Sequence, residues 1–426
     1  MSTAILPSVT TTTSPFGSAS HLQCRECGAR YSLGAEYACI ECFGPLEVGY
    51  EFGTVTREQI ESGPLSIWRY SALLPVSTTA ALEPNLAPGF TKLVRADNLA
   101  QALGITGVLW VKDDSGNPTH SFKDRVVAVA QSAARRLGLS TLSCASTGNL
   151  ANAVAAAAAR GAQRSVVLIP SNLEPGKVVT TAAYGTTLIA VEGNYDDVNR
   201  LCGELIGDSV TDDWGFVNVN LRPYYAEGSK TLGYEIAEQL GWRLPQQVVI
   251  PIASGALLTK VDKGFREFID LGLVKKTPYR IFGAQAVGCS PVEQAFRAGH
   301  DVVRPVRPDT IAKSLAIGNP ADGPYALDVV RRTGGSIGAV TDEEIVEGIR
   351  LLAETEGIFA ETAGGVTVAT LRALVRSGEL DPTAETVLLN TGDGLKTLDA
   401  VSPHVGPAGT ISPSVSAVVN LLGGLA

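Results

Sequence analysis

The stretch that decides the fold is GVLWVKDDSGNPTHSFKDRVVAVAQSAARRLGLSTLSCASTGNLANAVAAAAARGAQRSVVLIP, residues 107–170. In it, short apolar segments typical of strands alternate with longer periodic segments typical of helices. The expected strands are GVLWVK, TLSCAS and SVVLIP, and the expected helices are RVVAVAQSAARRLG and NLANAVAAAAARG. The alternation returns in QQVVIPIAS, LLTKVDKGFREFIDLG and RIFGAQA. This order predicts an α/β fold with open, mostly parallel twisted sheets and helices on both faces.

Length and composition limit the classes of protein that the chain can belong to. At 426 residues the chain is long enough for two or three domains with cores of their own. Its formal net charge of −9 argues against a nucleic-acid-binding or anionic-membrane surface. No apolar run reaches the roughly 18 residues that span a bilayer, and the N-terminus lacks the basic and apolar parts of a secretory signal. We therefore expect a cytoplasmic protein without nucleic-acid or membrane partners.

The two ends of the chain differ in composition from its centre. Residues 1–20, MSTAILPSVTTTTSPFGSAS, are rich in Ser and Thr and carry no charge, which predicts a disordered lead-in. The apolar tail SAVVNLLGGLA, residues 416–426, is too short to span a membrane. We expect this tail to dock on the body of the protein or on another subunit.

Four cysteines near the N-terminus form the pattern C-x2-C-x11-C-x2-C, with Cys24, Cys27, Cys39 and Cys42 as its members. Four thiolates suit tetrahedral zinc, and a metal would organise a segment too small to fold alone. Two disulfides, which a reducing cytosol disfavours, or an empty site are the alternatives. We expect residues 21–50 to form a zinc-ribbon-like module in which the metal is structural.

Lys123 occupies an unusual place for a lysine, within NPTHSFKDR. Ser121 and Asp124 fit the S-x-x-D capping pattern, which places Lys123 in the first turn of a helix. The positive end of the helix dipole and the apolar neighbours would lower the pKa of Lys123 and favour a neutral, nucleophilic amine. A solvated lysine, or one paired with Asp124, is the ordinary alternative.

Three loops follow expected strands and could meet this lysine. ASTGN carries Ser146, Thr147 and Asn149; a second loop spans residues 253–257, ASGAL; and NTGDG carries Thr391. Strand-to-helix turns of this kind aim backbone N–H groups at an anion, such as a carboxylate or a phosphate. Small-residue turns are also common as simple connections. Because open α/β sheets bind ligands at the carboxyl ends of their strands, we expect the three loops to border one site.

NPTHSFKDR, ASTGN, VNVNLRPYYAEGSKT and NTGDGLK together resemble the threonine synthases, which are pyridoxal-phosphate enzymes of fold type II. The resemblance runs from Leu22 to Leu398, and the Cys-rich start resembles the N-terminal extension of plant-like and bacterial members. The resemblance implies two interleaved α/β domains over residues 51–426, the smaller one at roughly 130–220. It also implies a homodimer that acts on a small phosphorylated amino acid.

The resemblance assigns roles to the site residues. Lys123 would bind pyridoxal 5'-phosphate covalently and, once released by substrate, act as the general base. Asn149 would hydrogen-bond the cofactor's ring hydroxyl, and Thr391 its ring nitrogen. Ser146 and Thr147 would hold the substrate carboxylate. The residues that would cradle the cofactor phosphate are Ala253, Ser254, Gly255, Ala256 and Leu257.

The implied reaction converts O-phospho-L-homoserine and water to L-threonine and phosphate by β,γ-elimination and hydration. One segment, NVNLRPYYAEG, departs from the N-S-x-N-P-Y-R-x-E-G pattern of many members. Val219 replaces the usual Ser and Tyr225 the usual Arg, so Arg222 is the candidate for the substrate phosphate. A surface or interface Arg222 is the alternative. The departure leaves open a cysteate synthase-like or other replacement enzyme that acts on a phosphorylated amino acid, and a non-catalytic binding protein is a third possibility.

Overall fold

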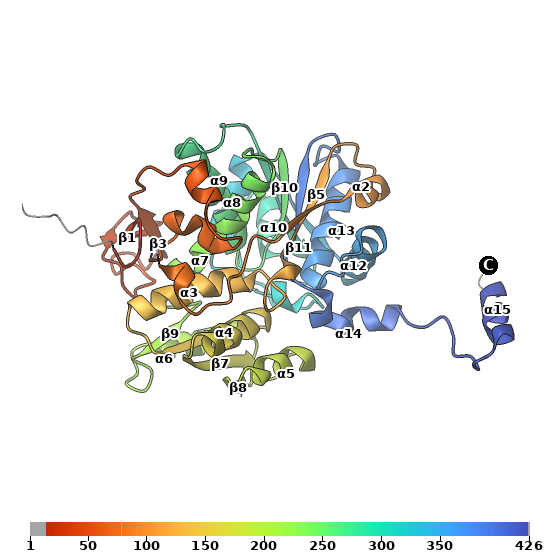
Figure 1. Ribbon diagram of the computed structural model, residues 1–426, viewed down its shortest axis with the longest axis horizontal. Coiled ribbons are helices and arrows are strands. Elements are labelled where there is room, and N and C mark those ends of the chain that lie inside the picture. The colour runs from red at the N-terminus through yellow and green to blue at the C-terminus, as the bar shows by residue number, and fades with distance from the viewer. Residues whose placement is uncertain (1–13, 78, 425–426) are drawn as a thin grey trace, which may run out of the picture.

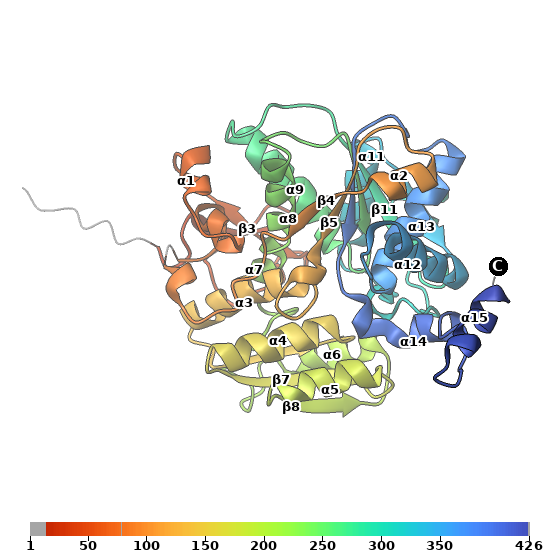
Figure 2. The same cartoon turned by 45° about the vertical axis from the view of Figure 1, so that its right-hand side comes forward.

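The structure is a computed structural model that describes residues 14–77 and 79–424 (Figure 1). Its strands form a three-stranded, a four-stranded and a six-stranded sheet. The two larger sheets are mostly parallel and are covered by helices (Figure 2), which confirms the expected α/β class. Within the described ranges, we find no helix long and apolar enough to cross a membrane.

The six-stranded sheet has the order β12-β11-β10-β13-β5-β4, and only the edge strand β4 is antiparallel to its neighbour. Its buried strands are continuous apolar runs because both faces are covered by helices. Val248 and Ile250 pack toward α8, α9, α10 and α11, while Val249 packs toward α2, α12 and α13. The strands are β4 (Lys92–Arg95), β5 (Leu109–Asp113), β10 (Gln247–Pro251), β11 (Arg280–Ala286), β12 (Ile337–Val340) and β13 (Thr386–Asn390). The helices are α2 (Asp97–Leu103), α8 (Lys230–Gln239), α9 (Ala256–Asp270), α10 (Pro291–Arg297), α11 (Gly323–Arg332), α12 (Asp342–Glu356) and α13 (Thr362–Ser377).

The four-stranded sheet is parallel throughout, with the order β8-β7-β6-β9. Its core on one side includes residues of α3 and α4, and on the other residues of α6. The strands span residues 141–216, inside the range 130–220 expected for the smaller domain. The elements are α3 (Lys123–Arg136), β6 (Thr141–Ala145), α4 (Asn149–Arg160), β7 (Arg164–Pro170), α5 (Pro175–Ala183), β8 (Thr187–Val191), α6 (Tyr195–Leu205) and β9 (Trp214–Phe216).

The small antiparallel sheet β2-β1-β3 carries the four cysteines and consists of β1 (Ala19–Cys24), β2 (Arg30–Tyr31) and β3 (Leu46–Tyr50). Residues 1–13 of the expected disordered lead-in lie outside the described residues. For residues 14–20 the expectation is corrected, because Phe16 is buried and its ring stacks on Tyr224 at a centroid distance of 5.4 Å. The apolar contact orders this part of the chain before β1 begins. We call residues 19–50 the Cys module.

The remaining elements connect these layers or end the chain. Helices α1 (Arg57–Glu61) and α7 (Arg222–Glu227) are short, as is α14 (Leu398–Val401). Short 3₁₀ segments occur at Ile67–Leu73, Ala80–Leu82, Asp114–Gly116, Lys313–Leu315, Gly394–Thr397 and Ser402–His404. The last helix, α15 (Val415–Gly423), has no buried residue and is separated from the body by an extended connection in Figure 1. The described part of the tail, residues 416–424, therefore does not dock on its own chain, and docking on another subunit remains a prediction.

Candidate active site

Lys123 is the first residue of α3, as the sequence predicted, but the expected cap is wrong. No side chain caps α3, and the backbone of Phe122 is already helical one residue earlier. The carboxylate of Asp124 turns back instead and accepts from the N–H and the hydroxyl of Thr119, at 2.7 and 2.8 Å. These two donors are buried and need an acceptor, so Asp124 stabilises the preceding loop.

A buried ion network fixes the start of α3. Arg125 is fully buried, and its guanidinium donates to Asp114 at 2.7 and 2.8 Å and to Glu235 at 2.8 Å. Lys112 Nζ donates to the same Glu235 carboxylate at 2.7 Å. The network joins α3 to β5 and α8, and therefore holds Lys123 in place. Sequence reasoning missed Arg125, because its partners lie 11 and 110 residues away.

The backbone next to Lys123 is bonded to the end of β13. Phe122 N–H donates to Thr391 C=O at 3.0 Å, which brings Lys123 and Thr391 to the same place. Lys123 Nζ donates to the hydroxyl of Tyr225 at 3.1 Å. Burial lowers the pKa of Lys123 to about 8, although the nearby Glu361 carboxylate acts in the opposite direction. The structure therefore contains an amine that is easily neutralised, as the sequence predicted.

A cavity lies over Lys123. Its lining brings together residues that are far apart in the chain. It includes every residue that the sequence assigned to cofactor binding, namely Lys123, Asn149, Ala253, Ser254, Gly255, Ala256, Leu257 and Thr391. Because three of these groups follow parallel strands, their convergence is what the strand order of an α/β sheet requires.

The turn after β10 forms one end of this cavity. Gly255 has a φ of 92°, and a Cβ there would lie 2.6 Å from the carbonyl oxygen of Asp322. Only glycine combines this backbone conformation with this close approach. The turn leads directly into α9, a helix of 15 residues whose start receives no side-chain cap bond. The N–H of Ala256 donates to Ser254 Oγ only at 3.4 Å, and the helix start that follows makes the turn suited to an anion.

Asn149 belongs to a second buried polar group at the cavity. Its side-chain amide donates to both oxygens of Glu361, each at 2.9 Å. Lys396 Nζ donates to the amide oxygens of Asn149 and Asn152, each at 3.1 Å. Helix α13 begins at Thr362, directly after Glu361. The sequence did not indicate that the buried Glu361 and the half-buried Lys396 both contact Asn149.

The proposed substrate residues line a second, adjoining cleft. Its walls include Lys123, Ser146, Thr147, Arg222 and Tyr225. The hydroxyl of Ser146 accepts from the N–H groups of residues 148 and 151, at 2.9 and 2.8 Å, which leaves its proton to donate. Arg222 forms an ion pair with a neighbouring aspartate, residue 322. The structure thus brings the three substrate candidates into one cleft with Lys123.

Residues 85–392 match the family described as pyridoxal-phosphate dependent enzyme. The chain belongs to this family. It is 37% identical over 384 residues to the threonine synthase of Methanocaldococcus jannaschii, covering 89% of this chain and 93% of that protein. It is also 37% identical over 382 residues to the threonine synthase of Methanosarcina acetivorans, covering 88% and 92%. These relatives confirm the resemblance to threonine synthases.

A solved structure of low sequence identity supports the fold alone. Diaminopropionate ammonia lyase from Escherichia coli superposes with a TM-score of 0.63 at 20% identity, covering 82% of this chain and 93% of that chain. As a pyridoxal-phosphate dependent enzyme, the chain has residues that fit the cofactor. The uncapped turn at Gly255 suits a phosphate group, and the amine of Lys123 suits an aldehyde.

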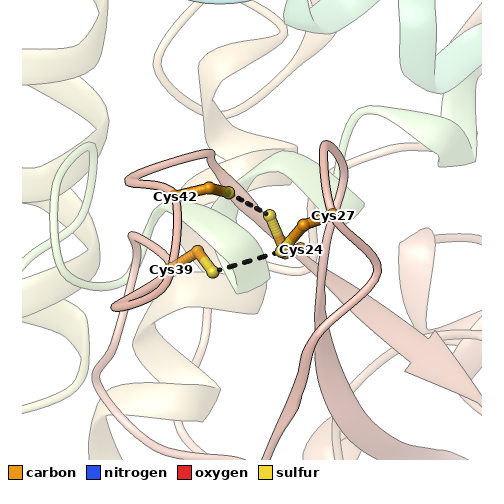
Figure 3. A group of neighbouring side chains, drawn as sticks. All are labelled: Cys24, Cys27, Cys39 and Cys42. Atoms are coloured by element: carbon orange, nitrogen blue, oxygen red, sulfur yellow. Dashed lines mark hydrogen bonds between the residues drawn. The ribbon is translucent and has the colours of Figure 1, made fainter.

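The four cysteines of this pyridoxal-phosphate dependent enzyme lie together in the Cys module (Figure 3). All four sulfur atoms lie within 4.8 Å of one another. Cys24 and Cys42 are 3.5 Å apart, as are Cys27 and Cys39. Sulfurs about 2.3 Å from a tetrahedral zinc are about 3.8 Å apart, whereas a disulfide bond measures about 2.0 Å. The arrangement therefore fits a metal site better than two disulfides.

Proposed function

We propose that the protein is a threonine synthase, which converts O-phospho-L-homoserine and water to L-threonine and phosphate. The observation that carries the proposal is a lysine of lowered pKa between an anion-binding turn and a cleft that holds Arg222. Its sequence relatives over most of the chain are threonine synthases. Bound pyridoxal phosphate supplies an electron sink for the negative charge that develops on the substrate.

The side chains divide the work between cofactor and substrate. Lys123 holds the cofactor and then, as a free amine, removes the α proton of the substrate and moves a β proton. Tyr225 orients this amine through its hydroxyl, 3.1 Å from Nζ. Asn149 would hydrogen-bond the ring hydroxyl of the bound cofactor. Thr391 would meet the ring nitrogen of the bound cofactor, and because a hydroxyl does not enforce protonation there, the cofactor would supply a milder electron sink.

The anionic groups have separate partners. The turn of residues 253–257 cradles the cofactor phosphate through backbone N–H groups. Ser146 and Thr147 bind the substrate carboxylate, since both line the cleft beside Lys123. Arg222, which lines the same cleft, is the cation that meets the substrate phosphate. Tyr225 stands where many threonine synthases have an arginine, and its hydroxyl instead accepts from Lys123 Nζ. We assign these residues to the two interleaved domains, residues 51–426.

A steady-state assay tests the function. We expect the purified holoenzyme to release phosphate and L-threonine from O-phosphohomoserine in equal amounts. Turnover of O-phosphoserine with sulfite, without turnover of O-phosphohomoserine, would replace the proposal with a cysteate synthase-like activity. A colourless protein that takes up no pyridoxal phosphate would instead indicate a non-catalytic binding protein.

The pKa of Lys123 predicts how the apoprotein takes up its cofactor. Only the neutral amine adds to an aldehyde, and the neutral fraction rises as the pH passes about 8. We expect the rate of pyridoxal phosphate uptake to rise from about pH 6.5 and to level off above about pH 9. Stopped-flow absorbance at several pH values measures this rate. A midpoint near the ordinary lysine pKa of about 10.4 would contradict the prediction.

We propose that the Cys module holds one structural zinc ion, bound by Cys24, Cys27, Cys39 and Cys42. Replacing the buried Cys39 by serine is expected to lower the zinc content of the purified protein to near zero, since the remaining ligands are one short. Elemental analysis by mass spectrometry measures the zinc per chain. Cys289→Ser, a buried cysteine outside the module, is the matched control and should keep about one zinc per chain.

We propose that the protein is a cytoplasmic homodimer acting on a small molecule. Reduced thiols in the Cys module fit the cytoplasm, and the net charge of −9 fits a small-molecule enzyme better than a nucleic-acid or membrane binder. The apolar side chains of α15 are exposed, with Val415 at 82%. An apolar groove lined by Ile349, Phe359, Leu398, Val401 and Val405 lies on the body. We assign this groove to α15 of a second copy.

Deleting residues 415–426 is therefore expected to shift the protein from dimer toward monomer at micromolar concentration, because the apolar contact is lost. Size-exclusion chromatography with light scattering measures the mass. Leu82→Ser removes an apolar side chain that is 86% exposed elsewhere, and should leave the mass unchanged. A truncated protein that remains fully dimeric would place the subunit interface away from α15.

A further inference from the structure

Helix α7 is held between the Cys module and the cleft. On the cleft side it carries Arg222. On its other side, the hydroxyl of Tyr224 donates to Gly34 C=O at 3.0 Å. The hydroxyl of Tyr50 donates to the carboxylate of Glu227 at 2.6 Å. The Cys module therefore packs directly against the helix that supplies the substrate-facing arginine.

A second connection runs through the first cysteine turn. Arg25 lies between Cys24 and Cys27, and its guanidinium donates to Asp322 at 3.1 Å. The other carboxylate oxygen of Asp322 is paired with Arg222. The Arg25 guanidinium also lies 3.6 Å from the ring centroid of Tyr325, whose hydroxyl donates to Glu26 of the same turn. Two arginines, one from the module and one from the cleft, thus share a single carboxylate.

The charges of this triad show what the second arginine contributes. Arg222 and Asp322 alone form a neutral pair, and a neutral pair attracts a phosphate dianion weakly. With Arg25 added, the group carries a net charge of +1. The Asp322 side chain is only 6% exposed, so solvent screens its charge little. Its backbone N–H donates to Ser254 C=O at 2.8 Å, which fixes the carboxylate beside the cofactor turn.

We propose that Arg25 is a positioning residue for recognition of the substrate phosphate. It occupies one oxygen of Asp322, leaves Arg222 with donors and charge for the phosphate, and makes the Cys module part of the substrate site. Tyr37 of the module lines the same cleft. The family match begins at residue 85, so the module lies outside the matched region. The nature of the anion rests on the proposed function.

The test compares Arg25→Gln with wild type as full-length, zinc-loaded holoenzyme. We expect KM for O-phosphohomoserine and the Kd of inorganic phosphate, by calorimetry, each to rise about tenfold. The value of kcat and the cofactor absorbance should stay near wild type, because Arg25 does not reach the cofactor cavity. Arg25→Lys keeps the charge and should restore both constants to within about threefold. The control is Arg30→Gln, at an exposed arginine of the same module. It is expected to change neither KM for O-phosphohomoserine nor the Kd of inorganic phosphate.

Arg222→Gln completes the experiment. Because Arg25 acts largely through Arg222, replacing both arginines should raise the phosphate Kd by less than the product of the two single effects. Zinc is measured on each sample, so that loss of the metal is recognised. An Arg25→Gln protein with wild-type zinc, KM and phosphate Kd would overturn the inference, as would independent, multiplying effects of the two substitutions. A wild-type enzyme that makes no threonine would contradict the proposed function only, since phosphate titration would still test Arg25.

Discussion

Lys123→Ala is expected to lower kcat for O-phosphohomoserine by at least about 10⁴-fold, because the variant loses both the cofactor attachment and the general base. The visible absorbance of the bound cofactor should shift to that of free pyridoxal phosphate. Steady-state kinetics and absorbance spectra measure the two effects. Lys92→Ala, at an exposed lysine of β4, is the control and should match wild type in both.

The same experiment distinguishes Lys123 from a second lysine, Lys396, as the general base. Burial also lowers the pKa of Lys396 to about 8, so its amine is as easily neutralised as that of Lys123. Lys396 Nζ, however, is bonded to the amide oxygens of Asn149 and Asn152 and is absent from the cavity lining. If Lys123→Ala kept more than about 1% of the wild-type kcat, the base would have to be another amine, and Lys396 would be the first candidate.

The sequence indicated the fold because parallel strands leave a strong local signal. A strand buried on both faces is a continuous apolar run, and TLSCAS, SVVLIP and QQVVIPIAS correspond to β6, β7 and β10. The loops after such strands are short and consist of small residues. Because the strands are parallel, these loops lie together at the carboxyl ends of the strands. Lys123, Asn149, Thr391 and the turn at Gly255 could therefore be placed together before any coordinates.

The rest of the site depends on contacts between distant residues, which local patterns do not encode. The S-x-x-D pattern predicted a cap for α3, but Asp124 satisfies buried donors of Thr119 instead. Nothing near Glu361 in the sequence shows that its carboxylate meets Asn149, 212 residues away. In the same way, Arg25 and Asp322 are 297 residues apart. Such pairs cannot be predicted from local sequence patterns, because only the folded chain brings the two charged residues together.

The Arg125 network stabilises the fold and also fixes the start of α3, which carries Lys123. Arg125→Met removes the shared partner of the Asp114 and Glu235 carboxylates while keeping an apolar stem of similar length. Because two buried carboxylates lose a cation, we expect the free energy of unfolding to fall by about 3–5 kcal/mol. Urea denaturation at about pH 7 measures this change. Arg95→Met breaks an exposed ion pair, Arg95 with Asp97, and should cost less than about 1 kcal/mol.

The pH dependence separates lost charge pairing from lost packing at Arg125. Burial acts to raise the pKa of Glu235, but Arg125 and Lys112 hold it at about 2. This depressed pKa stabilises the wild-type fold above the unfolded pKa of about 4.3, and the contribution is lost as the pH falls toward about 2. In Arg125→Met the Glu235 carboxylate should protonate at a higher pH than in wild type. Protonation removes the free-energy cost of keeping a charged group buried. The difference in unfolding free energy should therefore narrow below about pH 5, whereas a constant difference across this range would assign the effect to packing alone.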